Sequence, residues 1–348
     1  MTEPADKTAP SPAIASFLAG QGLAGQMLVP LATDASARRY FRLPGRGLLL
    51  MEDRHDPAAF AGFVLLSGHL RALGLSAPDV RATDAANGLA LIEDFGHATY
   101  RHCLAAGQEE PMLYQLAVDT LLQLHNDPHG AAVARPRYRI DLHLDEIGWF
   151  SDWFAPAVAP PGFDKTGFAA RFRQLWARAL APLQDQFSTL VLRDFHIDNL
   201  MYLPERAAVA RCGLLDFQDG VIGPCEYDLL SLLQDARRDL APGLEAAMLA
   251  RYIAGAPAHL GGAAGVTRRY HLLAADRHTR ILGNFVRLDQ RDGKPQYLAF
   301  LPRVIRQTEA ALKAAGLEEI AAFMESELPG WAAKGRALAT GAAAAPQG

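Results

Sequence analysis

Two short polar segments, each set between runs of apolar residues, constrain this chain more than any other feature. The first holds Asp194 and, five residues later, Asn199; the second holds Asp216, seventeen residues after Asn199. The apolar runs beside them have the length and composition of β-strands and lie at 188–192, 200–203 and 212–215. Such strands would hold both polar segments in fixed register. We therefore expect a β-containing fold built around a polar site.

The three polar side chains have the chemistry of a phosphoryl-transfer site. An aspartate such as Asp194 can hold and deprotonate an acceptor hydroxyl, and Asn199 and Asp216 offer the hard oxygen ligands that Mg²⁺ prefers. The alternative is that these residues only cap turns, as Asp and Asn commonly do in loops. Because the motif and its strand flanks agree, the sequence favours the catalytic interpretation.

The same segments resemble the aminoglycoside phosphotransferase family, which is protein-kinase-like. Residues 194–199 are similar to the family's H-G-D-x-H-x-x-N loop, and residues 223–229 to its G-D-P-x-Y-D-L segment. Two positions depart from the pattern, because Leu192 replaces the family's histidine and Arg193 its glycine. The resemblance implies that Asp194 is catalytic, that Asn199 and Asp216 bind metal, and that the cofactors are ATP and Mg²⁺.

Within that family, the chain is most similar to the bacterial anomeric kinases for N-acetylmuramate and N-acetylglucosamine, which serve peptidoglycan recycling. The likeness covers roughly residues 30 to 310 and is carried by segments at 34–42, 193–196, 215–219, 277–283 and 291–295. It implies a small-molecule sugar as substrate. Alternatives are another small-molecule kinase, of the aminoglycoside, choline or homoserine type, and a nucleotide-binding pseudokinase scaffold. A protein kinase is the weakest option, since the chain has no A-P-E segment.

The order of predicted elements indicates an α+β class and a two-lobed, protein-kinase-like fold. We expect a small β-rich, nucleotide-binding amino-terminal lobe over 13–96 and a larger helical carboxyl-terminal lobe over 97–335, which carries the catalytic loop and acceptor site. The Ala/Pro-rich ends, 1–12 and 336–348, predict disordered tails. Strands are predicted at 26–31, 37–43, 47–52, 80–83 and 88–93, with a helix starting at Asp56-Pro57. Later helices are predicted at 111–126, 143–154, 168–183, 226–238, 244–253, 267–284, 301–315 and 317–326.

The segment Leu91–Gly96 is the expected hinge, whose backbone would meet the adenine, with Glu93 and Phe95 as nucleotide-binding residues. Asp94-Phe95-Gly96 spells the kinase D-F-G motif, but it precedes Asp194 by one hundred residues. The metal-binding aspartate must follow the catalytic loop, so this match is a coincidence.

The lysine that kinase-type sites carry on the third strand is absent. The chain has no lysine between Lys7 and Lys165, and the helix after that strand has no acidic residue to pair with one. We expect Arg38 or Arg39 to supply the missing charge; strand alternation puts them on opposite faces, so only one face can serve. Alternatively, both are surface charges and Mg²⁺ alone neutralises the triphosphate.

A basic stretch near the carboxyl terminus predicts an anionic acceptor. Residues 266–310 hold nine basic and four acidic side chains, a local charge of +5 in a chain of net charge −4. Arg277, Arg280 and Arg287 are the expected acceptor-binding residues, because arginine recognises carboxylates well. The alternative is a solvated helix face.

Other residues near the site are expected to support it. Arg193 should form a structural salt bridge, Asp198 should brace the loop, and Asp228 should hold its own helix and the preceding loop. His196 is expected to be structural, and His125 to lie in the core. An aromatic group could form core or one wall of the acceptor site, with core favoured; it comprises Trp149, Phe150, Trp153 and Phe154.

Composition agrees with a cytoplasmic enzyme. A net charge of −4 and a pI near 6.3 predict no nucleic-acid partner. No apolar run reaches the length of a membrane span, and residues 1–7 lack the apolar core of a secretion signal. Three cysteines, an odd number, indicate free thiols in a reducing compartment. We expect a monomer with no membrane partner.

Overall fold

The structure is a computed structural model that describes residues 11–31 and 38–343. The chain divides into two compact units. Unit 1 holds the residues up to His129 together with Asp194–Gly220, and unit 2 holds Gly130–Arg193 and the residues from Val221 onward. Contacts therefore group Asp194–Gly220, which holds the predicted catalytic loop, with the amino-terminal sheet, whereas the sequence suggested a division after Gly96.

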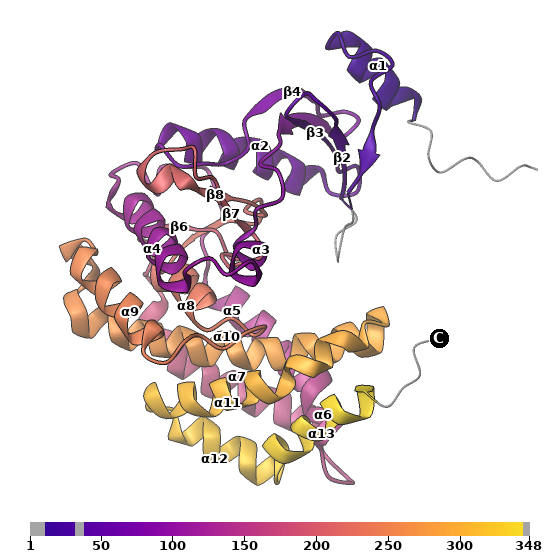
Figure 1. Ribbon diagram of the computed structural model, residues 1–348. Helices are drawn as coiled ribbons and strands as arrows, with labels where there is room; N and C mark the ends of the chain where they lie inside the picture. The colour runs from indigo at the N-terminus through magenta and orange to yellow at the C-terminus, as the bar shows by residue number, and fades with distance from the viewer. Residues whose placement is uncertain (1–10, 32–37, 344–348) are drawn as a thin grey trace, which may run out of the picture. The chain divides into compact units, whose positions relative to one another are not determined.

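Unit 1 is built on an antiparallel sheet of five strands in the order β1-β2-β3-β5-β4. Figure 1 labels β2, β3 and β4 of this sheet. The strands are β1 (Val29–Pro30), β2 (Arg39–Leu43), β3 (Leu48–Glu52), β4 (Val80–Asp84) and β5 (Leu89–Glu93). These five strands were predicted from the sequence, with boundaries that differ by a few residues. Leu43, Leu50 and Leu91 form part of the core on one sheet face. Burying these apolar side chains is the main force that holds the sheet together.

Helix α1 (Pro12–Gly20) packs Ile14, Phe17 and Leu18 into that core. Ser11 caps its first turn. Residues 11 and 12 of the predicted amino-terminal tail therefore belong to a capped helix, and residues 1–10 lie outside the described part of the chain.

Helix α2 (Pro57–Ala72) begins where the sequence predicted. The Asp56 side chain accepts a hydrogen bond from the backbone N–H of Ala59 at 2.9 Å, and Pro57 occupies the first helical turn. Gly88, at φ +61°, turns the chain between β4 and β5; a Cβ there would lie 2.2 Å from the Asp53 carbonyl oxygen. Only glycine fits this position.

A second hairpin completes unit 1 and carries the polar residues found in the sequence. It consists of β7 (Leu200–Tyr202) and β8 (Cys212–Leu214), joined through η3 (Ala208–Arg211). The Leu214 N–H donates to the Ser76 carbonyl and the Tyr202 N–H to the Ala98 carbonyl, both at 2.7 Å. The hairpin is therefore fixed to the segments that follow α2 and β5. Helices α3 (Tyr100–Ala105) and α4 (Glu110–Asn126) belong to the same unit.

Unit 2 is mainly helical, as expected for the second lobe. Its first helices are α5 (Ile140–Trp149), the π-helical turn η1 (Phe150–Phe154), α6 (Ala155–Val158), α7 (Lys165–Leu180) and η2 (Ala181–Leu183). Strands β6 (Thr189–Val191) and β9 (Val221–Gly223) pair antiparallel. The later helices are α8 (Glu226–Leu233), α9 (Leu244–Gly255), η4 (Ala258–Leu260), α10 (Gly262–Asp292), η5 (Pro295–Phe300), α11 (Leu301–Ala314), α12 (Glu318–Glu327) and α13 (Trp331–Ala343).

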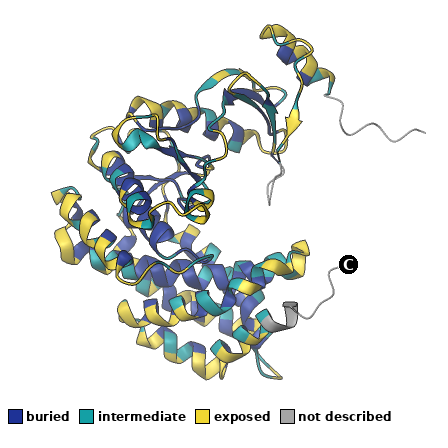
Figure 2. Ribbon diagram, in the orientation of Figure 1, coloured by how far each residue is buried: buried dark blue, intermediate teal, exposed yellow. Residues whose placement is uncertain are grey.

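Helix α10 is the central element of unit 2, and Figure 2 shows the buried stretch in its middle. Every residue from Leu272 to Thr279 is buried. Further along, Gly283 meets the end of α5, where a Cβ would lie 2.2 Å from the Trp149 carbonyl carbon. Glycine is required at this helix crossing because any side chain would force the two helices apart.

The prediction of a disordered carboxyl-terminal tail over 336–348 was partly wrong, because α13 extends to Ala343. Trp331 is 5% exposed, and the Gly335 backbone lies against Phe154 and Ile305. Alanine has the highest helix propensity, so an Ala-rich segment continues a helix that packing has started. Residues 344–348 lie outside the described part. Among the described helices, none combines the length and apolar composition needed to cross a membrane.

Candidate active site

The loop before Asp194 is held by the helix that follows the site. Asp228, at the start of α8, accepts hydrogen bonds from the backbone N–H groups of Leu192, at 2.6 Å, and Arg193, at 2.9 Å. Arg193 has φ +73°, a left-handed conformation that is unfavourable for a residue with a Cβ. The aspartate therefore stabilises a strained backbone directly before Asp194, the predicted catalytic residue, which confirms that Asp228 holds the preceding loop.

The structure brings Asp194, Asn199 and Asp216 together in unit 1. The Asn199 side-chain Nδ2 donates to the Asp194 carbonyl at 3.0 Å and lies 3.4 Å from Asp216 Oδ2. The Asp194 side chain is exposed, as a group that must meet an acceptor hydroxyl should be. Motif spacing predicted this contact correctly, because β7 and β8 pair antiparallel and bring Asn199, directly before β7, beside the residues that directly follow β8.

Asp216 lies in an environment that penalises its negative charge. Burial raises the pKa of its carboxyl group, and the nearby Asp194 raises it further, against a lowering by the hydrogen bond from Gln218. A cation beside these carboxylates would reverse this penalty. Asp216 also has φ +56°, a second left-handed residue at the site.

The donor set fits a Mg²⁺ ion that is shared with phosphates. Asn199 uses its amide nitrogen within the site, which leaves its oxygen as the ligand atom, and Asp216 offers carboxylate oxygens. Within the described ranges, no group of three or more His, Cys, Asp or Glu side chains could hold a metal ion. Mg²⁺ is usually bound by one or two carboxylates with substrate phosphates completing its shell, so a two-residue set is what the chemistry requires.

Arg38 lies beside this acidic pair. It is 5% exposed, its Nη1 is 3.8 Å from Asp216 Oδ1, and the same Nη1 donates to Gln218 Oε1 at 3.0 Å. Its Nε donates to Asp53 Oδ2 at 2.9 Å. The guanidinium group is therefore held between a carboxylate that follows β3 and the hairpin that carries Asp216.

Arg39 points to the other face of the sheet. Its guanidinium group pairs with Glu52, and its side chain is 57% exposed. Strand alternation had predicted that only one of the two arginines could face the site. The structure places Arg38 there, and Arg39 lies away from Asp216.

Gln218 is a site residue that sequence reasoning missed. Its Nε2 donates to Asp216 Oδ1 at 3.0 Å, while its Oε1 accepts from Arg38. The only signal for it was its place in the segment 215–219. An amide can serve both neighbours because it carries a donor and an acceptor.

A cavity of about 370 Å³ in unit 1 leads to Asn199 and Asp216. Apolar side chains from β3, β5, β7 and the end of β8 form its walls, at Leu49, Ile92, Met201 and Leu215. The expected hinge residues Glu93 and Phe95 also line it. An apolar slot that ends in oxygen ligands has the chemical layout needed for a base and its phosphates.

The hinge residues differ in how their side chains are used. The Glu93 carboxylate pairs with Arg206, and the Phe95 ring lies 4.9 Å from the same guanidinium group. The N–H of Glu93 donates to Asp79 and the N–H of Asp94 to Gly47. Glu93 and Phe95 remain predicted nucleotide contacts.

The three expected acceptor-binding arginines lie in different environments of unit 2. Arg277 is 5% exposed. Arg280 pairs with Glu146 and donates to the Tyr227 hydroxyl at 2.5 Å. Arg287 is half-buried on the last turns of α10. The structure does not bring these three side chains to one ligand position, and their acceptor role stays a prediction that Arg287 fits best.

Arg193 and Arg280 share Glu146 as a counter-ion. Both guanidinium groups pair with its carboxylate, and Tyr138 donates its hydroxyl to Glu146 at 2.6 Å. Burial alone would raise the pKa of Glu146, but Arg280 and Arg193 outweigh it and hold the pKa at about 2. The predicted structural salt bridge of Arg193 is confirmed.

The remaining support residues also behave as expected. Asp198 pairs with Arg101, which braces the catalytic loop against α3. His196 contacts the Asn199 amide at 3.4 Å, and His125 is buried in α4. The four aromatic residues do not all belong to the core. Phe150 and Phe154 are fully buried, as a core position requires, whereas Trp149 is only half-buried.

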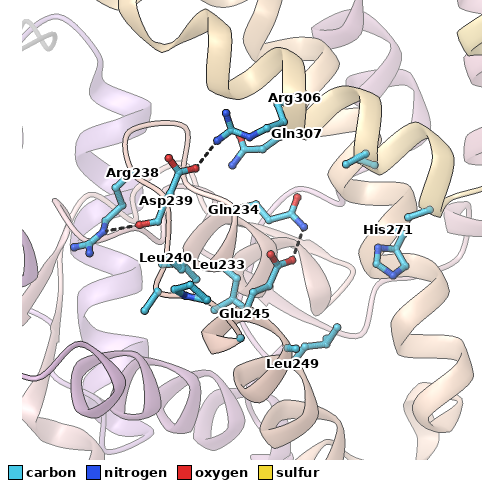
Figure 3. Close-up of a pocket in the computed structure, with 17 residues that line it drawn as sticks. Leu233, Gln234, Arg238, Asp239, Leu240, Glu245, Leu249, His271, Arg306 and Gln307 are labelled. Atoms are coloured by element: carbon cyan, nitrogen blue, oxygen red, sulfur yellow. Dashed lines mark hydrogen bonds and ion pairs between the residues drawn. The ribbon is translucent and has the colours of Figure 1, made fainter.

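A second cavity, of about 640 Å³, lies in unit 2 (Figure 3). Gln234 donates to Glu245 at 2.7 Å on one wall, and Arg306 pairs with Asp239 at 2.6 Å on another. Among the described residues, no member of the candidate site lines this cavity. We therefore exclude it from the site.

Comparison with known proteins identifies the family. The sequence pattern of the phosphotransferase enzyme family matches residues 28–266. The chain belongs to this family. A family member from Caulobacter vibrioides, named N-acetylmuramate/N-acetylglucosamine kinase, is 38% identical over 282 residues, which cover 77% of this chain and 74% of that protein. A protein of the same name from Pseudomonas aeruginosa is 31% identical over 293 residues, covering 82% of this chain and 83% of its own length.

Solved structures confirm the fold of the family. ADP-bound aminoglycoside phosphotransferase APH(2'')-Ib aligns with a TM-score of 0.57 at 14% identity and covers 88% of this chain and 98% of its own. A choline/ethanolamine kinase family protein from Mesorhizobium loti aligns with a TM-score of 0.56 at 15% identity. The alignment covers 93% of this chain and 97% of that protein. The fold is therefore α+β, two-lobed and kinase-like, and the chain is a phosphotransferase.

Proposed function

We propose that this phosphotransferase is an ATP-dependent sugar kinase that phosphorylates the anomeric hydroxyl of N-acetylmuramate and N-acetylglucosamine. The observation that carries the proposal is the 38% identity, over 77% of the chain, to a relative named for both sugars. Relatives from two Pseudomonas species and from Neisseria meningitidis carry the same name at 30–31% identity. Such a kinase would act as a cytoplasmic monomer in peptidoglycan recycling.

Asp194 is the catalytic residue in this mechanism. Its exposed carboxylate orients the anomeric hydroxyl for in-line attack on the γ-phosphorus and accepts the hydroxyl proton late in the reaction. The new bond joins the anomeric oxygen to phosphorus, and the bond that breaks releases ADP. Because the transition state is loose, Asp194 contributes mainly by positioning.

Asn199 and Asp216 bind the Mg²⁺·ATP complex through their oxygen atoms. A bound Mg²⁺ ion would neutralise phosphate charge as ADP leaves. Asp216 benefits in turn, because the neighbouring Asp194 and Asp219 carboxylates disfavour its negative charge. Arg38 adds a fixed positive charge next to Asp216 and takes the place of the missing third-strand lysine.

The apolar slot in unit 1 holds the adenine ring. Leu49, Ile92 and Leu215 form its walls, and the backbone near Glu93 and Phe95 supplies the polar contacts. This slot ends at the two metal-binding residues, as a nucleotide site requires. The ADP-bound fold relative supports a nucleotide as the phosphoryl donor.

A pseudokinase scaffold is the alternative from another functional class. It gains support only from the missing lysine, and Arg38 offers a replacement for that charge. The residues that perform the chemistry are all present and in contact. We therefore favour the enzyme.

A coupled assay for ADP release tests the proposal. The purified chain is given Mg²⁺·ATP with N-acetylmuramate, N-acetylglucosamine, choline, homoserine or kanamycin in turn. We expect turnover with the two amino sugars and only background with the other acceptors. Turnover with kanamycin and none with either sugar would overturn the sugar assignment. Inability to bind ATP would favour the scaffold.

A further inference from the structure

Arg206 connects the expected hinge to the β7–β8 hairpin. It follows β7 in the chain, and its guanidinium group reaches two other segments of unit 1. Nη1 donates to Ser76 Oγ at 2.7 Å, and Nη2 pairs with the Glu93 carboxylate. The same group lies 4.9 Å from the centre of the Phe95 ring. A single side chain thus contacts both of the hinge residues that are predicted to meet the nucleotide.

The hairpin also holds the Phe95 ring through its backbone. At Gly213, in the middle of β8, a Cβ would lie 2.9 Å from Cδ2 of that ring. The ring therefore packs directly on the glycine, and a larger side chain at this position would displace it. Phe95 is held by this packing and by the cation–π contact with Arg206.

Ser76 anchors the Arg206 guanidinium group to the hairpin. The serine hydroxyl donates to the Ala210 carbonyl at 2.6 Å and accepts from Arg206. Its own carbonyl accepts from the Leu214 N–H at 2.7 Å. A hydroxyl can serve both neighbours because it is a donor and an acceptor. The guanidinium group is therefore oriented by oxygen atoms of two segments, one after α2 and one in the hinge.

The same hairpin carries the predicted metal ligands. Asn199 directly precedes β7, and Asp216 comes two residues after β8. The Leu215 N–H donates to the Asn199 carbonyl at 2.9 Å, which fixes the two ends of the hairpin against each other. Both ligands and both hinge residues line the cavity of unit 1. Arg206 therefore ties the end of the cavity proposed for the base to the end proposed for the phosphates.

Glu93 has a second cation besides Arg206. Its Oε2 lies 3.6 Å from Arg71 Nη1 and accepts a hydrogen bond from the Asp79 N–H at 3.3 Å. Removal of the Arg206 guanidinium group thus leaves the carboxylate with a counter-ion. Both partners of the Arg206–Glu93 pair are also partly exposed, which limits what the pair contributes to stability. A variant without this guanidinium group should therefore fold.

We propose that Arg206 is a positioning residue of the nucleotide site, which holds the hinge at a fixed distance from Asn199 and Asp216. This inference rests on the proposed function, which supplies ATP as the phosphoryl donor. Among the residues that the structure describes, Arg206 is not one that lines the cavity, so it acts through Glu93 and Phe95. A hinge that is fixed before the nucleotide binds loses little entropy on binding.

Calorimetry on Arg206→Met, without acceptor sugar, compares two ligands. Mg²⁺·ADP carries a base and phosphates, whereas Mg²⁺·tripolyphosphate carries phosphates alone. We expect the dissociation constant of Mg²⁺·ADP to rise about tenfold, the loss of roughly one hydrogen bond to the base. The dissociation constant of Mg²⁺·tripolyphosphate should stay as in the wild type. In the coupled assay, the variant should raise the KM for ATP while kcat changes by less than about twofold.

Arg206→Lys and Arg211→Met are the matched variants. Lysine keeps the positive charge but lacks the planar fork that reaches two oxygen atoms, so it should raise the Mg²⁺·ADP dissociation constant about threefold. Should Arg206→Met fail to fold, the lysine variant carries the same comparison of the two ligands. Arg211 belongs to the same hairpin and donates to the Ala208 carbonyl at 3.2 Å. Arg211→Met should therefore leave both dissociation constants unchanged.

Three results would overturn the positioning role while leaving the sugar-kinase function in place. The first is Mg²⁺·ADP binding in Arg206→Met as tight as in the wild type. The second is an equal rise in both dissociation constants, because a general disturbance of unit 1 weakens base and phosphate binding alike. The third is the same loss in Arg211→Met, which would assign the effect to the charge of the hairpin. Wild-type protein that binds no Mg²⁺·ADP would contradict both this inference and the proposed function.

Discussion

Arg38 and Asp216 approach within 3.8 Å, guanidinium Nη1 to carboxylate Oδ1, across two different β-structures of unit 1. Asp53, just after β3, holds the guanidinium group from the other side. Kinase-type sites usually place the cation on the third strand and its acidic partner on the following helix. In the proposed mechanism, Arg38 before β2 replaces that cation, and Asp53 after β3 takes the place of its acidic partner.

Replacing Arg38 should therefore impair ATP use more than replacing Arg39. We expect Arg38→Ala to raise the KM for ATP about tenfold, the loss of roughly one charge-assisted contact. Arg39→Ala is the matched control, since its side chain pairs with Glu52 on the other face. Arg38→Ala alone leaves the buried Asp53 carboxylate without its counter-ion. The double variant Arg38→Met/Asp53→Asn avoids this and should show the same raised KM for ATP as Arg38→Ala. Unchanged ATP kinetics in both Arg38 variants would remove the substitute-cation idea.

Gln218 should affect metal and nucleotide binding through its contact with Asp216. Gln218→Leu removes one hydrogen bond to the carboxylate and one to Arg38, each worth roughly 0.5–1.5 kcal/mol. We expect the dissociation constant of Mg²⁺·ADP, measured by calorimetry without acceptor, to rise about threefold or more. Binding as tight as in the wild type would show that Gln218 does not position Asp216.

Removing the charge of Glu146 should destabilise unit 2. Glu146→Gln leaves Arg193 and Arg280 without their shared counter-ion, and the loss of one partner in a buried ion pair costs about 3–5 kcal/mol. Denaturant unfolding measures this change. Glu319→Gln is the control, because its ion pair with Arg178 is largely exposed and should change stability by less than about 1 kcal/mol. Equal effects in the two variants would refute the assignment.

Acid should destabilise the protein from near pH 6.5 downward. Burial lowers the pKa of His125 to about 3 from its ordinary value of 6.5, so the folded state keeps this ring neutral while the unfolded state takes up a proton. The contribution is fully present above pH 6.5 and is lost as the pH falls toward 3. We expect the free energy of unfolding to decrease over this window, and the decrease to be shallower in His125→Gln. Identical slopes in the two proteins would contradict the pKa shift.

The sequence predicted those features that local patterns encode. Strand alternation located the five-stranded sheet and separated Arg38 from Arg39, and the motif order brought Asn199 and Asp216 into contact. The Arg280–Glu146 ion pair could not be predicted from the sequence, because it joins two helices that are far apart in the chain and hydrophobic periodicity gives no information about such contacts. The helix α13 was missed because alanine-rich segments are helical or disordered according to their packing, which the sequence does not display.

The identity of the phosphorylated oxygen tests the central claim most directly. N-acetylglucosamine and Mg²⁺·ATP are incubated with wild-type protein or with Asp194→Asn, and the product is examined by phosphorus–proton correlation NMR. We predict a phosphorus coupled to the anomeric proton in the wild-type reaction, and a rate lower by orders of magnitude in Asp194→Asn while ATP binding is retained. A phosphorus coupled to any other sugar proton, or full activity in Asp194→Asn, would contradict the proposed site and reaction.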